Sequence, residues 1–177
     1  MRCPLRIAVA LLASCSSLAI AQQSAPMAIA FRATVTEASE RLVAAAQLMP
    51  GDKYDFKPTP AQMSFGDVIV HLSEGNDYLC STVAGTTAAK RSEVKADAGK
   101  EKLVARLRET FQSCESTLAK LDDSGLSRMV PWFGNRQVTR AQAVLATAQD
   151  WADHYSQLAI YLRLNGLLPP TAKQKEE

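Results

Sequence analysis

The sequence contains few of the side chains that carry out most enzymatic reactions. Its 177 residues include two histidines and four cysteines, and two of the cysteines lie within the first 15 positions. There is no Gly-x-Ser-x-Gly nucleophile motif, no glycine-rich phosphate loop, no Cys-x-x-Cys pair and no paired Glu-x-x-His motif. These absences argue against serine hydrolases, phosphate-loop nucleotide binders, thioredoxin-like proteins, zinc fingers and di-iron bundles.

An excess of one charge is also absent. The chain has 20 Lys and Arg against 18 Asp and Glu. Residues 1–21 contain Arg2 and Arg6 and no acid, so a chain without them has 18 of each and no net charge. Such a chain has no basic surface to attract nucleic acid or an acidic membrane, and neither partner is expected.

Residues 1–21 have the layout of a secretory signal peptide. A basic start precedes an uncharged, mostly apolar or small stretch at 7–18, and Ala19-Ile20-Ala21 offers the small residues that signal peptidase reads. An alternative is the lipobox-like stretch 12–15, in which Cys15 would become a lipidated N-terminus. Either processing predicts a periplasmic or secreted protein, with a lipid anchor in the second case. No later stretch has about 20 uninterrupted apolar residues, so no transmembrane span is predicted.

The rest of the chain has the periodicity of four amphipathic helices. Apolar side chains recur at steps of three and four residues, while strand signals are nearly absent. Four such helices make one bundle around one core, so the predicted fold is an all-α four-helix bundle in a single domain. The predicted helices span residues 31–49, 64–83, 101–121 and 140–165.

The segments between the predicted helices lack this periodicity. Residues 50–63 are proline-containing and predict an extended loop. Residues 85–100 predict a second loop, long enough to permit a crossover connection. Residues 126–138 contain a proline and a glycine and predict a turn or a short helical piece. Residues 171–177 form a charged tail.

Two cysteines, Cys80 and Cys114, lie outside the signal region, and an even number is typical of an oxidising compartment. Cys114 lies on the apolar face of the third predicted helix. Cys80 follows His71 by nine residues, or about 900° of helix, so it points away from His71. We predict a Cys80–Cys114 disulfide, with the third helix packed on the side of the second helix opposite His71 and the fourth helix on the near side. The alternative is two buried thiols.

The two histidines are the remaining candidates for chemistry. His71 lies midway along the second predicted helix, and His154 lies midway along the fourth. Asp150 precedes His154 by four residues, so the two side chains share a helix face. If the two helices are neighbours, the three side chains converge as a ligand set that suits Zn²⁺, Ni²⁺, Fe²⁺ or Mn²⁺ and leaves coordination positions open. The alternative is a hydrogen-bonded edge histidine and an ordinary helix ion pair.

Two longer motifs resemble those of the DinB-like superfamily of four-helix bundles. In the first, over residues 53–71, a Pro-Thr-Pro segment precedes His71. In the second, over residues 153–170, His154 begins a His-Tyr-x-Gln motif that is followed by Tyr-Leu-Arg-x-Asn-Gly. The similarity covers residues 28–170 and implies the same fold that the periodicity predicts.

The resemblance also implies a metal site. Members of this superfamily typically hold a divalent metal through three histidines, one on the second helix and two on the last, spaced as His-x-x-x-His. By resemblance His71 is the first ligand and His154 the last, and the middle position is Asp150, where the family usually has histidine. A carboxylate there still ligates and relatively favours harder metals. Alternatively, the site has been lost.

Two functions remain open at this point. The first is an exported metalloprotein that acts on a small molecule as a hydrolase or transferase, with His71, Asp150 and His154 as ligands. Some relatives are thiol-dependent transferases or isomerases, but their thiol cofactors are cytosolic, so that activity transfers poorly to an exported chain. The second is a non-catalytic periplasmic bundle without the metal, which acts as a binding or stress-related protein and can form a homodimer through an exposed helix face.

Overall fold

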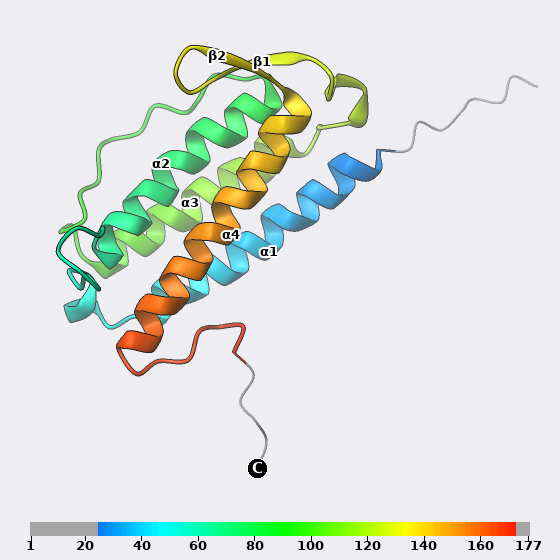
Figure 1. Ribbon diagram of the computed structural model, residues 1–177. Helices are drawn as coiled ribbons and strands as arrows, with labels where there is room; N and C mark the ends of the chain where they lie inside the picture. Colours follow the sequence, from blue (N-terminus) through cyan, green and yellow to red (C-terminus); the bar gives the residue numbers. More distant parts are fainter. Residues whose placement is uncertain (1–24, 173–177) are drawn as a thin grey trace, which may run out of the picture.

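Four long helices make up most of residues 25–172, the part of the chain that the computed structural model describes (Figure 1). The four-helix bundle predicted from the periodicity is confirmed. The predicted signal peptide over 1–21 and the end of the charged tail, 173–177, lie outside the described residues. The helices are α1 (Pro26–Leu48), α2 (Phe65–Ala84), α3 (Lys100–Leu118) and α4 (Arg140–Leu164).

Both helices that carry the histidines begin with a capping box. At α2 the Ser64 hydroxyl accepts from the Asp67 N–H at 3.0 Å, and the Asp67 carboxylate accepts from the Ser64 N–H at 2.9 Å. The Ser64 hydroxyl also donates to the Asp67 carboxylate at 2.7 Å, and this bond together with that of the Ser64 N–H holds the pKa of Asp67 below its usual range. Thr139 and Gln142 make the same reciprocal pair at the start of α4. The first turns of α2 and α4 are therefore fixed by local contacts.

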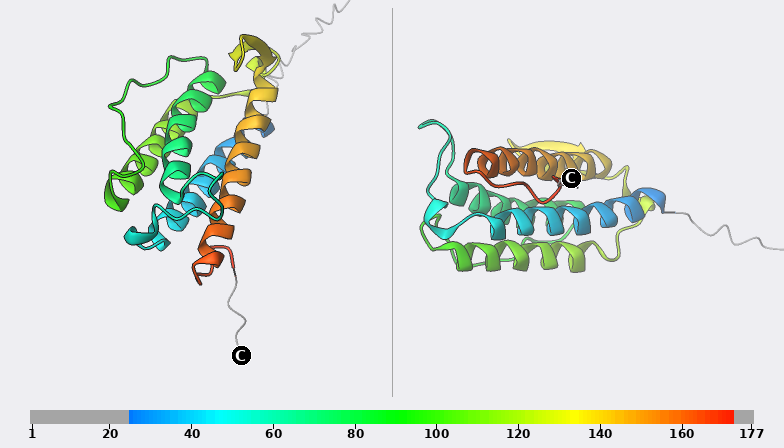
Figure 2. Two further views of the ribbon diagram at one scale, coloured as in Figure 1. Left: turned by 60° about the vertical axis from the view of Figure 1, so that its left-hand side comes forward. Right: turned by 90° about the horizontal axis from the view of Figure 1, so that it is seen from below.

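The four helices pack so that α2 has α3 on one side and α4 on the other. Contacts join α1 with α3 and α4, and α2 with α3 and α4. Viewed from below, α3 and α4 lie on opposite sides of the bundle with α1 between them (Figure 2, right). The seam between α2 and α4, on which His71 and His154 were expected to meet, therefore exists.

The connection between α2 and α3, residues 85–99, is the crossover that the sequence permits. It leaves α2 at Gly85, whose positive φ of 74° ends the helix, and returns along the outside of the bundle (Figure 1). At its far end it packs closely on the first turn of α2. The Ala96 carbonyl oxygen lies only 2.8 Å from the position that a Cβ at residue 66 would occupy, so the contact requires Gly66. The return makes α2 and α3 parallel, while α1 and α4 run the other way.

A disulfide joins Cys80 of α2 to Cys114 of α3, with their Cα atoms 5.3 Å apart. Both side chains are buried. As the helical spacing predicts, α3 lies on the disulfide side of α2 and α4 lies on the His71 side. The covalent bond therefore fixes the face of α2 opposite the one that carries the histidine.

The prediction of a turn or short helical piece over 126–138 is wrong. After a short 3-10 turn, η2 (Asp123–Gly125), the chain forms an antiparallel hairpin of β1 (Met129–Trp132) and β2 (Arg136–Thr139). Gly134 and Asn135 at its tip adopt positive φ of 69° and 57°. Gly and Asn suit the tip because they adopt a positive φ at lower energetic cost than other residues. Pro131 is accommodated in β1 because an edge of a two-stranded ribbon tolerates a residue without an N–H donor.

Two helix ends also differ from the prediction, and the first has a tertiary cause. Helix α1 begins at Pro26 rather than 31, and the Asp123 carboxylate accepts hydrogen bonds from the Met27 and Ala28 N–H groups at 3.1 and 2.8 Å. Helix α3 ends at Leu118 rather than 121. Of the predicted tail, Thr171 is held by a hydrogen bond of its N–H to the Tyr155 hydroxyl at 3.0 Å.

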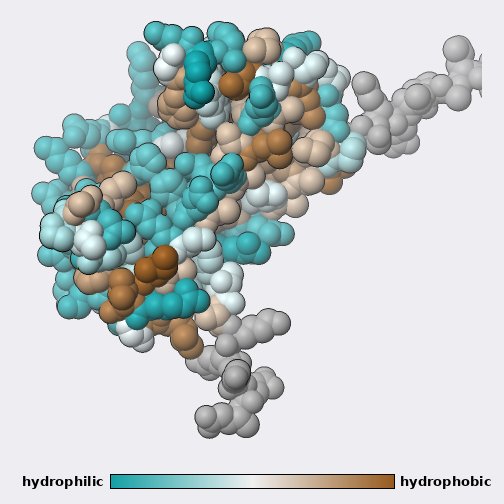
Figure 3. All heavy atoms as spheres, in the orientation of Figure 1, coloured by the Kyte–Doolittle hydropathy of each residue, from teal (hydrophilic) through white to brown (hydrophobic). Residues whose placement is uncertain are grey.

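The surface that carries α4 is hydrophilic over its middle, with apolar side chains gathered toward both ends of the helix (Figure 3). Leu145, Ile160 and Leu164 are each more than half exposed there.

Within residues 25–172, no helix combines the length and apolar character needed to cross a membrane.

We predict that removing the disulfide lowers stability without changing the fold. The bond closes a loop between cysteines 34 positions apart, so its loss should cost about 3 to 4 kcal/mol of unfolding free energy in the chain-entropy account. Urea unfolding of Cys80→Ser/Cys114→Ser, followed by circular dichroism, measures this cost. The reduced wild type should match the variant, and an oxidised wild type no more stable than either would contradict the prediction.

Candidate metal centre

The three predicted ligands come together on the seam between α2 and α4. His71 projects from the middle of α2, and Asp150 and His154 project from successive turns of α4. One ligand atom from each residue lies within 4.8 Å of the other two. Spacing within one helix placed Asp150 beside His154, and the packing of the two helices adds His71.

His154 is oriented by the backbone of its own helix. Its Nδ1 lies 2.8 Å from the Asp150 carbonyl oxygen and 3.6 Å from the Asp150 carboxylate. A neutral imidazole that donates from Nδ1 to the carbonyl has an unprotonated Nε2, the form in which histidine binds a metal. The His154 side chain is 15% exposed, so this orientation is held within a largely packed surface.

His71 lies on the outer side of the group. Its residue is exposed, whereas Asp150 and His154 are half-buried. The rings of His71 and His154 face each other with centroids 4.9 Å apart and an angle of 34° between their planes. The group is therefore open to solvent on one side, which leaves room for further ligands.

A buried amide lies beneath the seam and joins three helices. The Asn76 side-chain oxygen of α2 accepts a hydrogen bond from Trp151 Nε1 of α4 at 2.7 Å. The amide nitrogen of Asn76 donates to the Thr110 hydroxyl of α3 at 3.2 Å. All three residues are almost completely buried. The pair of Asn76 and Trp151 thus fixes the distance and rotation between the two helices that carry the histidines.

Trp151 is itself held between two other rings. The Phe31 ring of α1 stacks on it at a centroid distance of 5.9 Å, and the Phe111 ring of α3 lies at 5.6 Å. Trp151 adjoins Asp150 in the sequence and lies three residues before His154. Its fixed position therefore sets the direction in which both α4 ligands point.

Sequence reasoning missed Asn76, although a signal was present. Asn76 lies four residues after Leu72 and four before Cys80, so it occupies the core face of α2. A polar side chain at such a position must find a hydrogen-bond partner inside the protein. The pattern predicts a buried polar contact, but it does not identify Trp151 or Thr110 as the partners.

Gln157 and Tyr161, one and two turns beyond His154, have a structural role. Gln157 Nε2 donates to the Tyr161 hydroxyl at 3.2 Å, and that hydroxyl donates to the Met63 carbonyl oxygen at 2.8 Å. This chain of contacts ties α4 to the loop before α2. It ends at the backbone, so it orders the lower edge of the seam rather than the ligand atoms.

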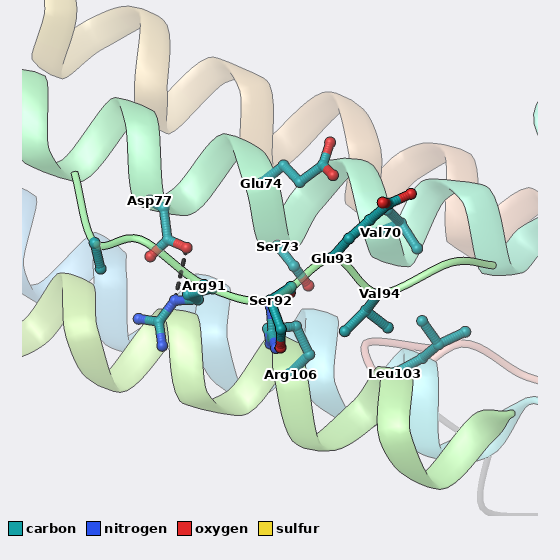
Figure 4. A pocket seen from close by; sticks show the side chains of 11 residues that line it. Val70, Ser73, Glu74, Asp77, Arg91, Ser92, Glu93, Val94, Leu103 and Arg106 are labelled. Atoms are coloured by element: carbon teal, nitrogen blue, oxygen red, sulfur yellow. Dashed lines mark hydrogen bonds and ion pairs between the residues drawn. The ribbon is translucent and has the colours of Figure 1, made fainter. Parts of the chain in front are cut away.

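A cavity of about 340 Å³ lies on another flank of α2, beneath the crossover (Figure 4). Arg91 of the crossover forms ion pairs there with Asp77 of α2, at 2.7 Å, and with Glu109 of α3. Glu74 lies at the cavity edge, and its carboxylate points away from Arg91 (Figure 4). These charged residues hold the crossover against the bundle, and Glu74 stands outside the group of His71, Asp150 and His154.

Comparison with known proteins adds a family and a fold. The family model described as the DinB superfamily matches residues 34–158. A DinB-like protein from Bacillus subtilis has a similar structure, with a TM-score of 0.66 and 17% identity, over 83% of this chain and 99% of that one. A DinB-like protein from Bacillus cereus gives a TM-score of 0.67 and 16% identity, over 81% and 95%. A conserved protein from Enterococcus faecalis gives 0.62 and 18%, over 77% and 95%. No curated protein matches the sequence.

We predict that Asn76→Ala destabilises the bundle by about 2 to 4 kcal/mol, because it leaves the buried Trp151 N–H and Thr110 hydroxyl without their partner and opens a cavity. Chemical denaturation followed by tryptophan fluorescence measures the change. Gln149→Ala, at an exposed position of the same α4, is the matched control and should stay within about 0.5 kcal/mol of wild type. Equal stabilities of the two variants would contradict a central role for Asn76.

Proposed function

Because the chain belongs to the DinB superfamily, we propose that it is an exported protein that binds a divalent transition metal between α2 and α4 and acts on a small molecule. The ligands in this proposal are His71, Asp150 and His154. The observation that carries it is the meeting of two imidazoles and a carboxylate from separate helices within 4.8 Å of one another. Hydrolysis and group transfer are the reaction classes that we propose.

The donor set fits a metal in chemistry and in scale. Nitrogen and oxygen ligands lie about 2.0 to 2.2 Å from a bound transition metal, which places neighbouring donor atoms about 3 to 4 Å apart. Small rotations of the side chains close the present group to that size. His71 has the greatest freedom to move because it is exposed.

The mixed donor set bears on the choice of metal. Two imidazoles suit Zn²⁺, Ni²⁺ and Fe²⁺, whereas the Asp150 carboxylate relatively favours harder ions such as Mn²⁺. When bound, such an ion supplies Lewis-acid chemistry to a small molecule. The chain's own contribution is to orient His154 through the Asp150 carbonyl and to leave the His71 side accessible.

Export is the remaining part of the proposal. A disulfide between two buried cysteines is typical of proteins that fold outside the cytoplasm. The predicted signal peptide over residues 1–21 points the same way. A protein in that compartment does not meet cytosolic thiol cofactors, so we propose a substrate that occurs outside the cytoplasm.

We expect untagged protein, exported to a periplasm, to contain close to one equivalent of a transition metal by mass spectrometry. His71→Ala and His154→Ala should lose it, because two donors do not hold the ion against washing. Asp150→Ala should lose it as well, since it also leaves two donors and removes the carboxylate of the set. Asp153→Ala, an exposed acid next to His154, is the control and should retain the metal.

Two outcomes of this measurement would change the proposal. Metal retained in Asp150→Ala would make the two histidines the ligands and Asp150 a bystander. No metal in the wild type, even after reconstitution, would favour a non-catalytic binding bundle.

A second substitution tests the role of Asp150 as a ligand. We predict that Asp150→His raises the affinity for Zn²⁺ roughly tenfold and lowers the relative affinity for Mn²⁺, because a third imidazole replaces a hard oxygen donor. Competition with a chromophoric chelator measures both affinities. An unchanged preference between the two ions would show that residue 150 does not reach the metal.

A further inference from the structure

A line of side chains runs along one face of α2 from the three proposed ligands toward the β-hairpin. His71, Gly75 and Tyr78 are four and three residues apart, so they lie on the same face of the helix. At the rise of an α-helix, Tyr78 lies about 10 Å beyond His71. The direction is toward the hairpin, because β1 contacts α2 and the hairpin covers the end of that helix (Figure 1).

The middle of this line is open. A Cβ added to Gly75 would meet only the Leu79 side chain, at 4.0 Å, and no atom of α4 within that distance. Glycine in the middle of a helix lowers its stability, and close packing does not explain it here. Gly75 therefore leaves unfilled space on the α2 side of the seam, one turn from His71.

The far end of the line is aromatic. The ring of Phe133, at the hairpin tip, lies 4.4 Å from the ring of Tyr78 and 5.2 Å from the ring of Trp132, measured between centroids. Phe133 is 53% exposed although it packs on both rings. The hairpin thus holds a partly exposed ring above α2, where its free face is available to a flat apolar group.

The outer edge of the line carries a negative charge. Glu74 is exposed, lies one turn from His71 and forms no ion pair with any residue between 25 and 172. A carboxylate at this position disfavours an anionic group in the space over Gly75. Along the line, a proposed metal ligand at His71 is thus followed by open space at Gly75 and then by the aromatic rings of Tyr78 and Phe133.

We propose that the small molecule bound at the metal carries a metal-ligating head group and a neutral aromatic group about 10 Å away, which stacks on the free face of Phe133 beside Tyr78. This inference rests on the proposed metal function and names the substrate class of the same site. Gly75 provides the space through which the linker between the two groups passes. The hairpin, through Phe133, determines specificity for the aromatic group.

Two hydroxamates test this proposal by calorimetric titration of the zinc-loaded, disulfide-intact protein. Acetohydroxamate has only the metal-ligating head, whereas 4-phenylbutanehydroxamate adds a phenyl ring at about the required distance. We expect the phenyl compound to bind about tenfold more tightly, the gain from burying one ring. Phe133→Ala and Gly75→Leu should each remove most of that advantage and leave acetohydroxamate binding unchanged.

Leu145→Ala is the matched control, because Leu145 is a similarly exposed apolar residue and points about 140° away from Asp150 and about 180° away from His154 around the axis of α4. It should retain the full advantage of the phenyl compound. Equal binding of the two hydroxamates, or an advantage that survives in both Phe133→Ala and Gly75→Leu, would overturn the aromatic subsite and leave the metal site standing. Failure of acetohydroxamate to bind, together with absence of metal, would overturn both.

Discussion

The hydrogen bond between Asn76 and Trp151 is the contact on which the geometry of the site depends. It joins α2 to α4 in the core, five residues after His71 and three before His154, and the same amide reaches Thr110 of α3. In a buried setting such a contact is specific, because any rotation of either helix leaves a polar group without a partner. Apolar contacts alone tolerate small rotations of a helix. The hydrogen bond of the Asn76 amide does not tolerate such a rotation. This constraint brings together the three proposed ligands His71, Asp150 and His154.

The disulfide constrains α2 one turn beyond Asn76, on the face of the helix that points away from His71. Cys80 is attached to α3 on the face away from His71, and Asn76 is attached to α4 nearer that residue. The two constraints together define the rotation of α2 about its own axis. The crossover adds a third, since Arg91 joins α2 and α3 through Asp77 and Glu109. Because the crossover passes over α2 and α3, it does not lie across the seam of α2 and α4, and the candidate site stays accessible (Figure 2).

Much of this arrangement could be predicted from local patterns. Helical periodicity, two capping boxes and the nine-residue spacing of His71 and Cys80 are short-range signals, and they placed the four helices, the cysteine pair and the three candidate ligands on the correct faces. The hairpin was missed because Pro131 and Gly134 end a helix and also suit a short ribbon. The partners of Asn76, and the cap that Asp123 provides for α1, depend on contacts 75 and 95 residues apart in the sequence. No local pattern encodes such pairs.

The position of the disulfide has a consequence for the order in which the molecule assembles. The bond closes a segment made of α2, the crossover and α3, whose contacts are comparatively local and cost little loop-closure entropy. Helices α1 and α4 pack on each other across the whole of that segment, so their pairing has the greatest sequence separation in the bundle. We expect the segment to form early and α4 to dock last. Two of the three proposed ligands are on α4, so an ion captured there would favour the completed bundle over its partly assembled forms.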